Sequence, residues 1–137
     1  MNLTRRNLLA RASALMALNA LGWPLPGRAA SYPDKPVRLV VPYPPGAATD
    51  NLGRMAAEVY GKALGQTFIV ENRGGGGTTI GTRSVATAAP DGYTIGIVDS
   101  TFTINPGLLG SRLPYDTLKD FAPITLLATA PFVMVVH

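Results

Sequence analysis

The feature that most constrains the fold is an alternation of short β-branched runs with helix-forming segments. Residues 37–41 (Val-Arg-Leu-Val-Val) are typical of a buried strand, and Phe68-Ile69-Val70 predicts a second one. A third strand is predicted over 93–98, after an Ala-rich helical segment that reaches about Ala88. Strands separated by helices pair in parallel within one sheet. The sequence therefore predicts an α/β fold with a doubly wound, mostly parallel sheet.

The helix between the first two predicted strands has the clearest pattern. Apolar residues recur at spacings of three and four from Leu52 to Leu64, which places them on one helix face. Thr49 or Asp50 can cap its start, and Gly65 can end it. These signals predict a helix that covers one face of the sheet.

The rest of the chain is less regular. Thr78 or Thr79 can cap the second helix. Asn105-Pro106-Gly107 is typical of a turn, and the apolar runs at 124–127 and 132–136 predict two further strands.

Three loops follow the carboxyl ends of the predicted strands, where α/β sheets bind their ligands. They are residues 44–50, 72–81 and 99–105. The first two lead into helix N-termini, whose free N–H groups and dipole favour an anion. Their side chains are hydroxyls, amides and a few carboxylates, without a strong nucleophile. This pattern favours holding a carboxylate by hydrogen bonds over breaking a bond.

Each of these residues also has a purely structural interpretation. Asp50 can serve only as a helix cap, and Arg73 can be a solvated surface charge. The glycine run at 74–77 can be a flexible turn, and Asp99 can satisfy backbone groups at a strand end. The prediction of a binding site therefore depends on the three loops together.

A dinucleotide site is the rival interpretation of the same glycines. Gly75, Gly77 and Gly81 follow a strand and open a helix, and Asp99 ends the next strand. This layout resembles a nucleotide-binding turn with an acid for the ribose, although its spacing is not Gly-x-Gly-x-x-Gly. An exported dinucleotide-dependent oxidoreductase is thus an alternative function.

Charge and residue usage exclude several other classes. The net charge is +4, but from Ser31 onward eight basic residues balance eight acidic ones. A neutral body without a basic patch is a poor nucleic-acid binder. The chain has no cysteine, and its single histidine is His137. Disulfides, thiolate metal sites, multi-histidine metal sites and a Ser–His–Asp triad are excluded.

Residues 1–30 are typical of an export signal. Arg5 and Arg6 precede a short apolar run at 12–21, and small residues at Ala29 and Ala30 offer a cleavage site. The double arginine resembles a twin-arginine signal, and an ordinary Sec leader is the alternative. A run of ten residues is too short to span a bilayer as a helix, which disfavours a membrane anchor.

Short motifs spread over nearly all of residues 32–137 occur together in one known family. They are Tyr-Pro-Asp-Lys-Pro-Val-Arg-Leu-Val-Val-Pro-Tyr-Pro-Pro-Gly at 32–46 with Asp50, Leu64-Gly65-Gln66, Val70-Glu71-Asn72-Arg73, Ile80-Gly81, Val85-Ala86, Pro90-Asp91-Gly92-Tyr93-Thr94, Asn105-Pro106, Leu113-Pro114-Tyr115-Asp116 and Lys119-Asp120-Phe121. In combination they resemble the substrate-binding proteins of tripartite tricarboxylate transporters, the Bug or TctC-like family.

The resemblance implies a periplasmic solute-binding protein, not an enzyme, that captures small carboxylates for a membrane permease. It implies a type II periplasmic-binding-protein-like fold with two lobes, of which residues 31–137 are part of the first. It also implies a monomer without a cofactor. The ligand-binding residues expected from the family's loops are Tyr43, Pro45, Gly46, Ala47, Ala48, Thr49, Asp50, Gly77, Thr78, Thr79, Gly81, Ser100 and Thr101.

The sequence departs from the family pattern in three respects. Ala47 stands where the family usually has a glycine, and residues 73–78 lack the proline that stiffens this loop. Family members are also considerably longer, and this chain ends at His137 after an apolar run. We therefore expect a truncated product, with a fragment that does not fold stably as a further alternative.

Overall fold

The structure is a computed structural model that describes residues 31–131, 134 and 135. The predicted leader and most of the predicted strand at 132–136 lie outside these residues. The elements in chain order are β1 (Val37–Val41), α2 (Ala48–Leu64), β2 (Phe68–Asn72), α3 (Thr79–Ala86), β3 (Thr94–Gly96), α4 (Ser100–Leu109) and the 3-10 helix η1 (Gly110–Arg112). Among the described residues, no helix is long and apolar enough to cross a membrane.

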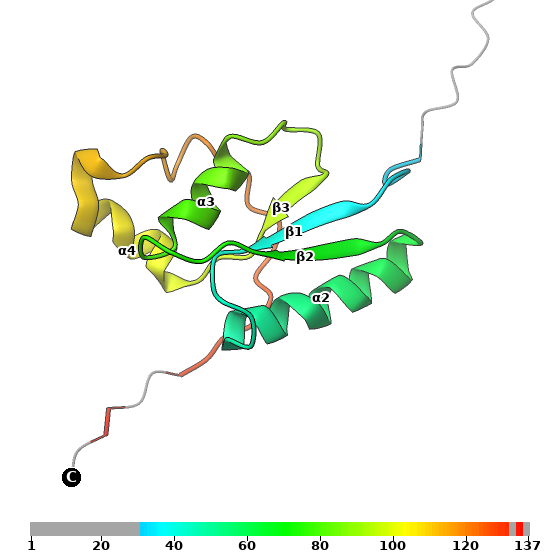
Figure 1. Cartoon of the computed structure of the whole chain (residues 1–137), viewed down its shortest axis with the longest axis horizontal. Helices are drawn as coiled ribbons and strands as arrows, with labels where there is room; N and C mark the ends of the chain where they lie inside the picture. Colours follow the sequence, from blue (N-terminus) through cyan, green and yellow to red (C-terminus); the bar gives the residue numbers. More distant parts are fainter. Residues whose placement is uncertain (1–30, 132–133, 136–137) are drawn as a thin grey trace, which may run out of the picture. The chain divides into compact units, whose positions relative to one another are not determined.

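The three strands form one parallel sheet in the order β2-β1-β3, with β1 in the centre (Figure 1). In this register Leu39 lies beside Val70 on one side and beside Ile95 on the other. The predicted parallel pairing and the first two strands are confirmed. The third strand is shorter than the predicted 93–98, because its ladder with β1 ends at Gly96.

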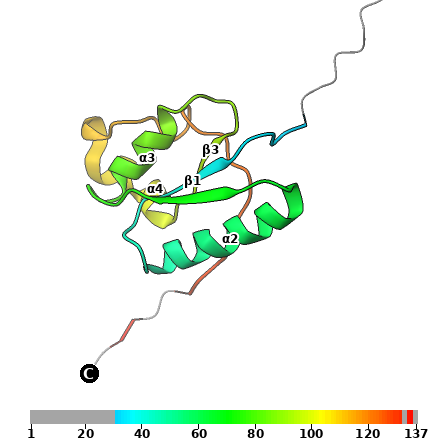
Figure 2. The same ribbon diagram turned by 45° about the vertical axis from the view of Figure 1, so that its right-hand side comes forward.

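The two longer connections place their helices on opposite faces of the sheet (Figures 1 and 2). Successive side chains of a strand point to opposite faces. Leu39 and Val41 of β1 therefore face α2 and form a buried cluster with Ala57 and Ile97. On the other face, a side chain at Gly96 would touch Val85 of α3 at 3.0 Å. This arrangement confirms the doubly wound sheet.

The predicted helix caps are only partly correct. Gly65 ends α2 in the left-handed conformation, with φ 69°, as predicted. The N-cap of α2 is Ala47, which has no side-chain acceptor, so Thr49 and Asp50 lie inside the first turn instead of capping it. Thr78 does occupy the N-cap position of α3, but its side chain makes no capping hydrogen bond.

The segment after β3 is helical where the sequence predicts a loop and a turn. The Asp99 side chain accepts a hydrogen bond from the Thr101 N–H and caps α4, which then contains Pro106. A proline removes one helical donor, and α4 nevertheless continues past Pro106 to Leu109. The predicted strand at 124–127 is wrong, because this run pairs with no strand among the described residues. An apolar run becomes a strand only where a neighbour accepts its backbone hydrogen bonds.

Candidate functional site: the carboxyl edge of the sheet

The loops that follow β1, β2 and β3 lie at one edge of the sheet, because parallel strands end on the same side (Figure 1). The chain moves from β1 to β2 and then crosses back over β1 to β3. The point where the strand order reverses lies between β1 and β3, and α/β sheets bind ligands in this crevice. The three predicted loops are therefore brought to one edge.

Asp50 holds the β1 loop in place. Its side chain is 2% exposed and accepts hydrogen bonds from the Gly46 N–H (2.8 Å), from Asn72 Nδ2 (2.8 Å) and from Arg54 Nε (3.0 Å). These bonds lower the pKa of Asp50 to about 2, and the bond from Gly46 has the largest effect. The carboxylate is thus ionised and already occupied by three donors. Its position fits a residue that shapes the loop.

Asn72 joins the end of β2 to the same loop. Its Nδ2 also donates to the Tyr43 carbonyl at 3.1 Å, and its Oδ1 accepts from Arg54 Nη2 at 3.2 Å. Asn72 begins the second predicted loop, but no sequence pattern assigns a role to Asn72 or Arg54. The signal that could have revealed Asn72 is its side-chain amide at the last position of β2, next to the end of the central strand β1.

Tyr43 spans the crevice between β1 and β3. Its hydroxyl donates to Asp99 Oδ2 at 2.6 Å and lies 3.2 Å from Thr101 Oγ1. Desolvation raises the pKa of Asp99, but hydrogen bonds from Tyr43 and Thr101 outweigh it, so the pKa lies below its usual value. Desolvation and the bond to Asp99 raise the pKa of Tyr43. At neutral pH the pair is a neutral phenol donating to a carboxylate.

The glycine loop is held in an uncommon conformation by α4. Gly75, Gly76, Gly77 and Thr78 all have positive φ, with 74° at Thr78, where a β-branched residue is rarely found. Asn105 of α4 is 4% exposed, and its Nδ2 donates to the Gly77 carbonyl at 3.0 Å. The loop is thus tied to the first turns of α4, a role of Asn105 that the sequence analysis did not predict.

Two predicted residues of this loop differ in accessibility. Thr79 is half-buried and donates its hydroxyl to the Gly76 carbonyl at 2.8 Å. Gly81 is buried, and a Cβ there would lie 2.5 Å from the Arg73 carbonyl oxygen and 2.8 Å from Pro42. Gly81 therefore allows α3 to approach the two neighbouring loops closely.

The N-terminus of α2 offers backbone donors at this edge. No side chain caps it, and Pro45, Gly46 and Ala48 are exposed, with Ala47 and Thr49 half-buried. The first N–H groups of a helix lack intrahelical partners and attract an anion. At α4, Ser100 is exposed and Thr101 half-buried. The residues described contain no cluster of acidic or His side chains that could hold a metal.

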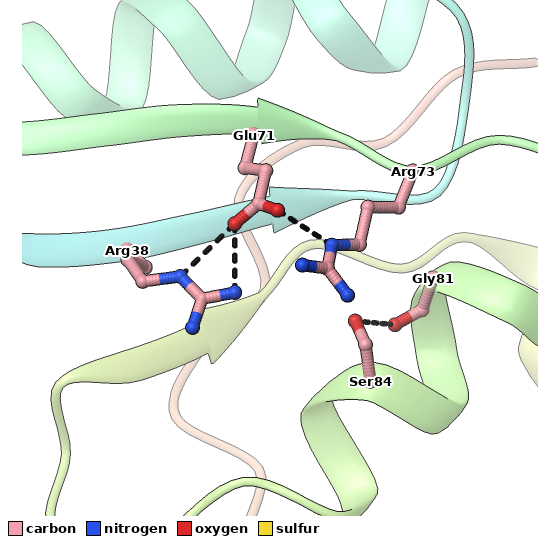
Figure 3. A network of polar contacts seen from close by, with 5 residues as sticks. All are labelled: Arg38, Glu71, Arg73, Gly81 and Ser84. Carbon is pink, nitrogen blue, oxygen red and sulfur yellow. Dashed lines mark hydrogen bonds and ion pairs between the residues drawn. The ribbon is translucent and has the colours of Figure 1, made fainter.

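An ion-pair network fixes Arg73, which precedes the glycine loop (Figure 3). Glu71 accepts from Arg38 Nε and Nη2 at 2.9 and 2.7 Å and from Arg73 Nε at 2.6 Å. The bond from Arg73, followed by that from Arg38, lowers the pKa of Glu71. Figure 3 also shows Ser84 donating to the Gly81 carbonyl at 2.6 Å. Arg73 is thus paired with a carboxylate and is more than a solvated surface charge.

Comparison with known proteins identifies the family. The sequence model described as "Tripartite tricarboxylate transporter family receptor" matches residues 52–137. Protein BugT of Bordetella pertussis is 37% identical over 138 residues, an alignment that covers 100% of this chain and 41% of BugT. The chain thus spans about 40% of the length of curated relatives such as BugT.

Solved structures give the same result. The periplasmic binding protein BugD is 45% identical with a TM-score of 0.65, over 68% of this chain and 31% of BugD. MatC from Rhodopseudomonas palustris with bound malate is 37% identical with a TM-score of 0.66, over 70% of this chain and 33% of MatC.

These matches confirm the resemblance and the α/β fold, as part of a longer binding-protein architecture. They do not support the alternative of a dinucleotide-dependent oxidoreductase, because the matched family consists of receptors. The chain belongs to the tripartite tricarboxylate transporter receptor family.

Proposed function

We propose that this chain forms one wall of the ligand cleft in a periplasmic receptor that captures small carboxylates for a tripartite tricarboxylate-type transporter. The observation that most supports this proposal is the uncapped N-terminus of α2 beside the β1–β3 crevice in a member of a receptor family. MatC, a structural relative, carries bound malate.

The proposed contacts are mostly backbone groups. The amides at the start of α2 and around the glycine loop hold the ligand carboxylate, and nearby hydroxyls orient it. Asp50 keeps the β1 loop in position, and Gly81 allows the close approach of α3. The other residues that we propose contact the ligand are Tyr43, Pro45, Gly46, Ala47, Ala48, Thr49, Gly77, Thr78, Thr79, Ser100 and Thr101.

Export, location and partners complete the proposal. Residues 1–30 act as the leader, through the twin-arginine or the Sec route, and residues 31–137 form the binding segment. The mature protein works in the periplasm as a monomer and delivers its ligand to the permease subunits of the transporter.

Thermal unfolding with and without malate tests this function. Ligand at 100 times its Kd adds about 2.7 kcal/mol of stability, so malate should raise the Tm measurably. Dimethyl malate, which lacks both negative charges, is the matched control and should leave the Tm unchanged. If neither malate nor a panel of di-, tricarboxylic and aromatic acids stabilises the chain, the proposed function is wrong.

The Ala48→Pro variant locates the site. Proline is tolerated at the first position of a helix, and Ala47 before it is extended, with φ −65° and ψ 160°. The substitution removes one backbone donor from the N-terminus of α2 without requiring a new fold. We expect weaker malate binding at unchanged Tm of the free protein. Unchanged binding would place the ligand elsewhere.

A further inference from the structure

The crevice between β1 and β3 exposes hydrogen-bond donors on one side and an acceptor on the other, whereas the ionised Asp50 in the first turn of α2 is buried and paired with Arg54. The uncapped amides of α2 lie at the end of the β1 loop, and the carboxylate of Asp99 lies after β3. Tyr43 connects the two sides, because its backbone belongs to the β1 loop and its hydroxyl reaches Asp99 at 2.6 Å. Tyr43 thus ties the loop that leads into α2 to the carboxylate that caps α4.

Asp99 can accept further hydrogen bonds. The residue is exposed, Oδ1 is bonded to the Thr101 N–H, and Oδ2 is bonded to the Tyr43 hydroxyl. A carboxylate offers about four acceptor positions, and these two bonds occupy one on each oxygen. The Thr101 hydroxyl and the Asp99 N–H also lower the pKa of Asp99, through weaker contacts than these two bonds. Capping of α4 and binding of a donor from solution are thus compatible at Asp99.

We propose that Asp99 is a specificity-determining residue, which selects carboxylates that carry a hydroxyl or ammonium group next to the carboxylate. The amides of α2 attract the anionic end of such a ligand, and Asp99 accepts a hydrogen bond from its neighbouring donor. A ligand without that donor presents hydrogen or a second negative charge to Asp99. This inference rests on the proposed function and adds the chemical class of ligand.

Succinate, malate and aspartate form a matched probe series for isothermal titration calorimetry. They share a four-carbon dicarboxylate skeleton and differ at one carbon, which carries hydrogen, hydroxyl or ammonium. The 137-residue chain should bind aspartate and malate more tightly than succinate. In Asp99→Asn this preference should fall by roughly tenfold, because a charge-assisted hydrogen bond becomes a neutral one. Asparagine retains helix capping, so α4 should be preserved.

Two further variants keep the result interpretable. Glu58→Gln removes the same charge from an exposed ion pair on α2 and should leave the preference unchanged. Asp99→Ser, also a good cap, replaces Asp99→Asn if that variant fails to fold.

The outcomes separate the two proposals. If the wild-type chain binds none of the three ligands, the proposed function is overturned, and this inference falls with it. If the wild-type chain binds carboxylates but Asp99→Asn shows the same order and ratios of affinity, only the role of Asp99 is overturned. Separate affinities for aspartate and malate tell whether ammonium or hydroxyl is the preferred donor.

Discussion

At the residue scale, buried polar groups at the carboxyl edge set the shape of the loops. Asp50 and Asn72 have their acceptors and donors satisfied by protein groups, which fix the carbonyl of Tyr43 and the amide of Gly46. The groups left accessible are backbone amides, hydroxyls and the exposed carboxylate of Asp99. Asp50 and Glu71 are already paired with arginines, so they are not the charges that distinguish ligands.

Gly81 offers a test of how tightly this edge is packed. Gly81→Ala would place a methyl group 2.5 Å from the Arg73 carbonyl oxygen and 2.8 Å from Pro42, and backbone atoms cannot move aside easily. We expect the free energy of unfolding to fall by at least about 2 kcal/mol, measured by urea denaturation.

Gly107→Ala is the matched control for Gly81→Ala. Gly107 lies in α4, and a Cβ there would have no heavy atom within 4 Å. Alanine should stabilise the helix by roughly 0.5–1 kcal/mol. Similar effects of the two substitutions would contradict the close approach of α3 at Gly81.

At the element scale, the sequence predicts what depends on neighbours in the chain. The run at 37–41, the periodic apolar face of α2 and Gly65 at its end are local signals, and each of them is found in the structure. The contacts of Asn105 and Tyr43 join residues 28 and 56 positions apart, so no local pattern reveals them. The sequence prediction missed α4 for a different reason. Its cap is a local contact between Asp99 and the Thr101 N–H, but the segment that follows lacks hydrophobic periodicity and contains Pro106.

The link between α4 and the glycine loop is open to measurement. Asn105 is 4% exposed, and Asn105→Ala removes the donor to the Gly77 carbonyl. A lost buried hydrogen bond costs about 1–3 kcal/mol, part of which should appear as faster hydrogen exchange at residues 75–79.

Asn51→Ala serves as its control. Asn51 is exposed on α2, and substitutions at such positions usually change stability by less than about 0.5 kcal/mol. If both variants leave hydrogen exchange in the glycine loop unchanged, α4 does not hold this loop.

At the scale of the whole molecule, ionised carboxylates join segments that lie far apart in the sequence. Asp50 binds the ends of β1 and β2 together, and Glu71 joins Arg38 of β1 to Arg73 after β2. In both groups hydrogen bonding to the charged form lowers the pKa. Folding is therefore coupled to their ionisation.

Acid should weaken the fold in a defined pH range. A carboxylate with a lowered pKa stabilises the folded state above its unfolded pKa, and this contribution is lost as the pH falls through the folded pKa. For Asp50 the range runs from 3.8 down to about 2. We expect the urea midpoint, followed by circular dichroism, to fall steadily over this range. Asp50→Asn should have a lower midpoint near neutral pH and a smaller further loss in acid, because its contribution no longer titrates.

Glu58→Gln, which removes an exposed acid paired with Lys62, should follow the wild-type curve closely. Parallel curves for wild type and Asp50→Asn would show that the acid sensitivity arises from other carboxylates, and that Asp50 does not link β1 and β2 through its charge.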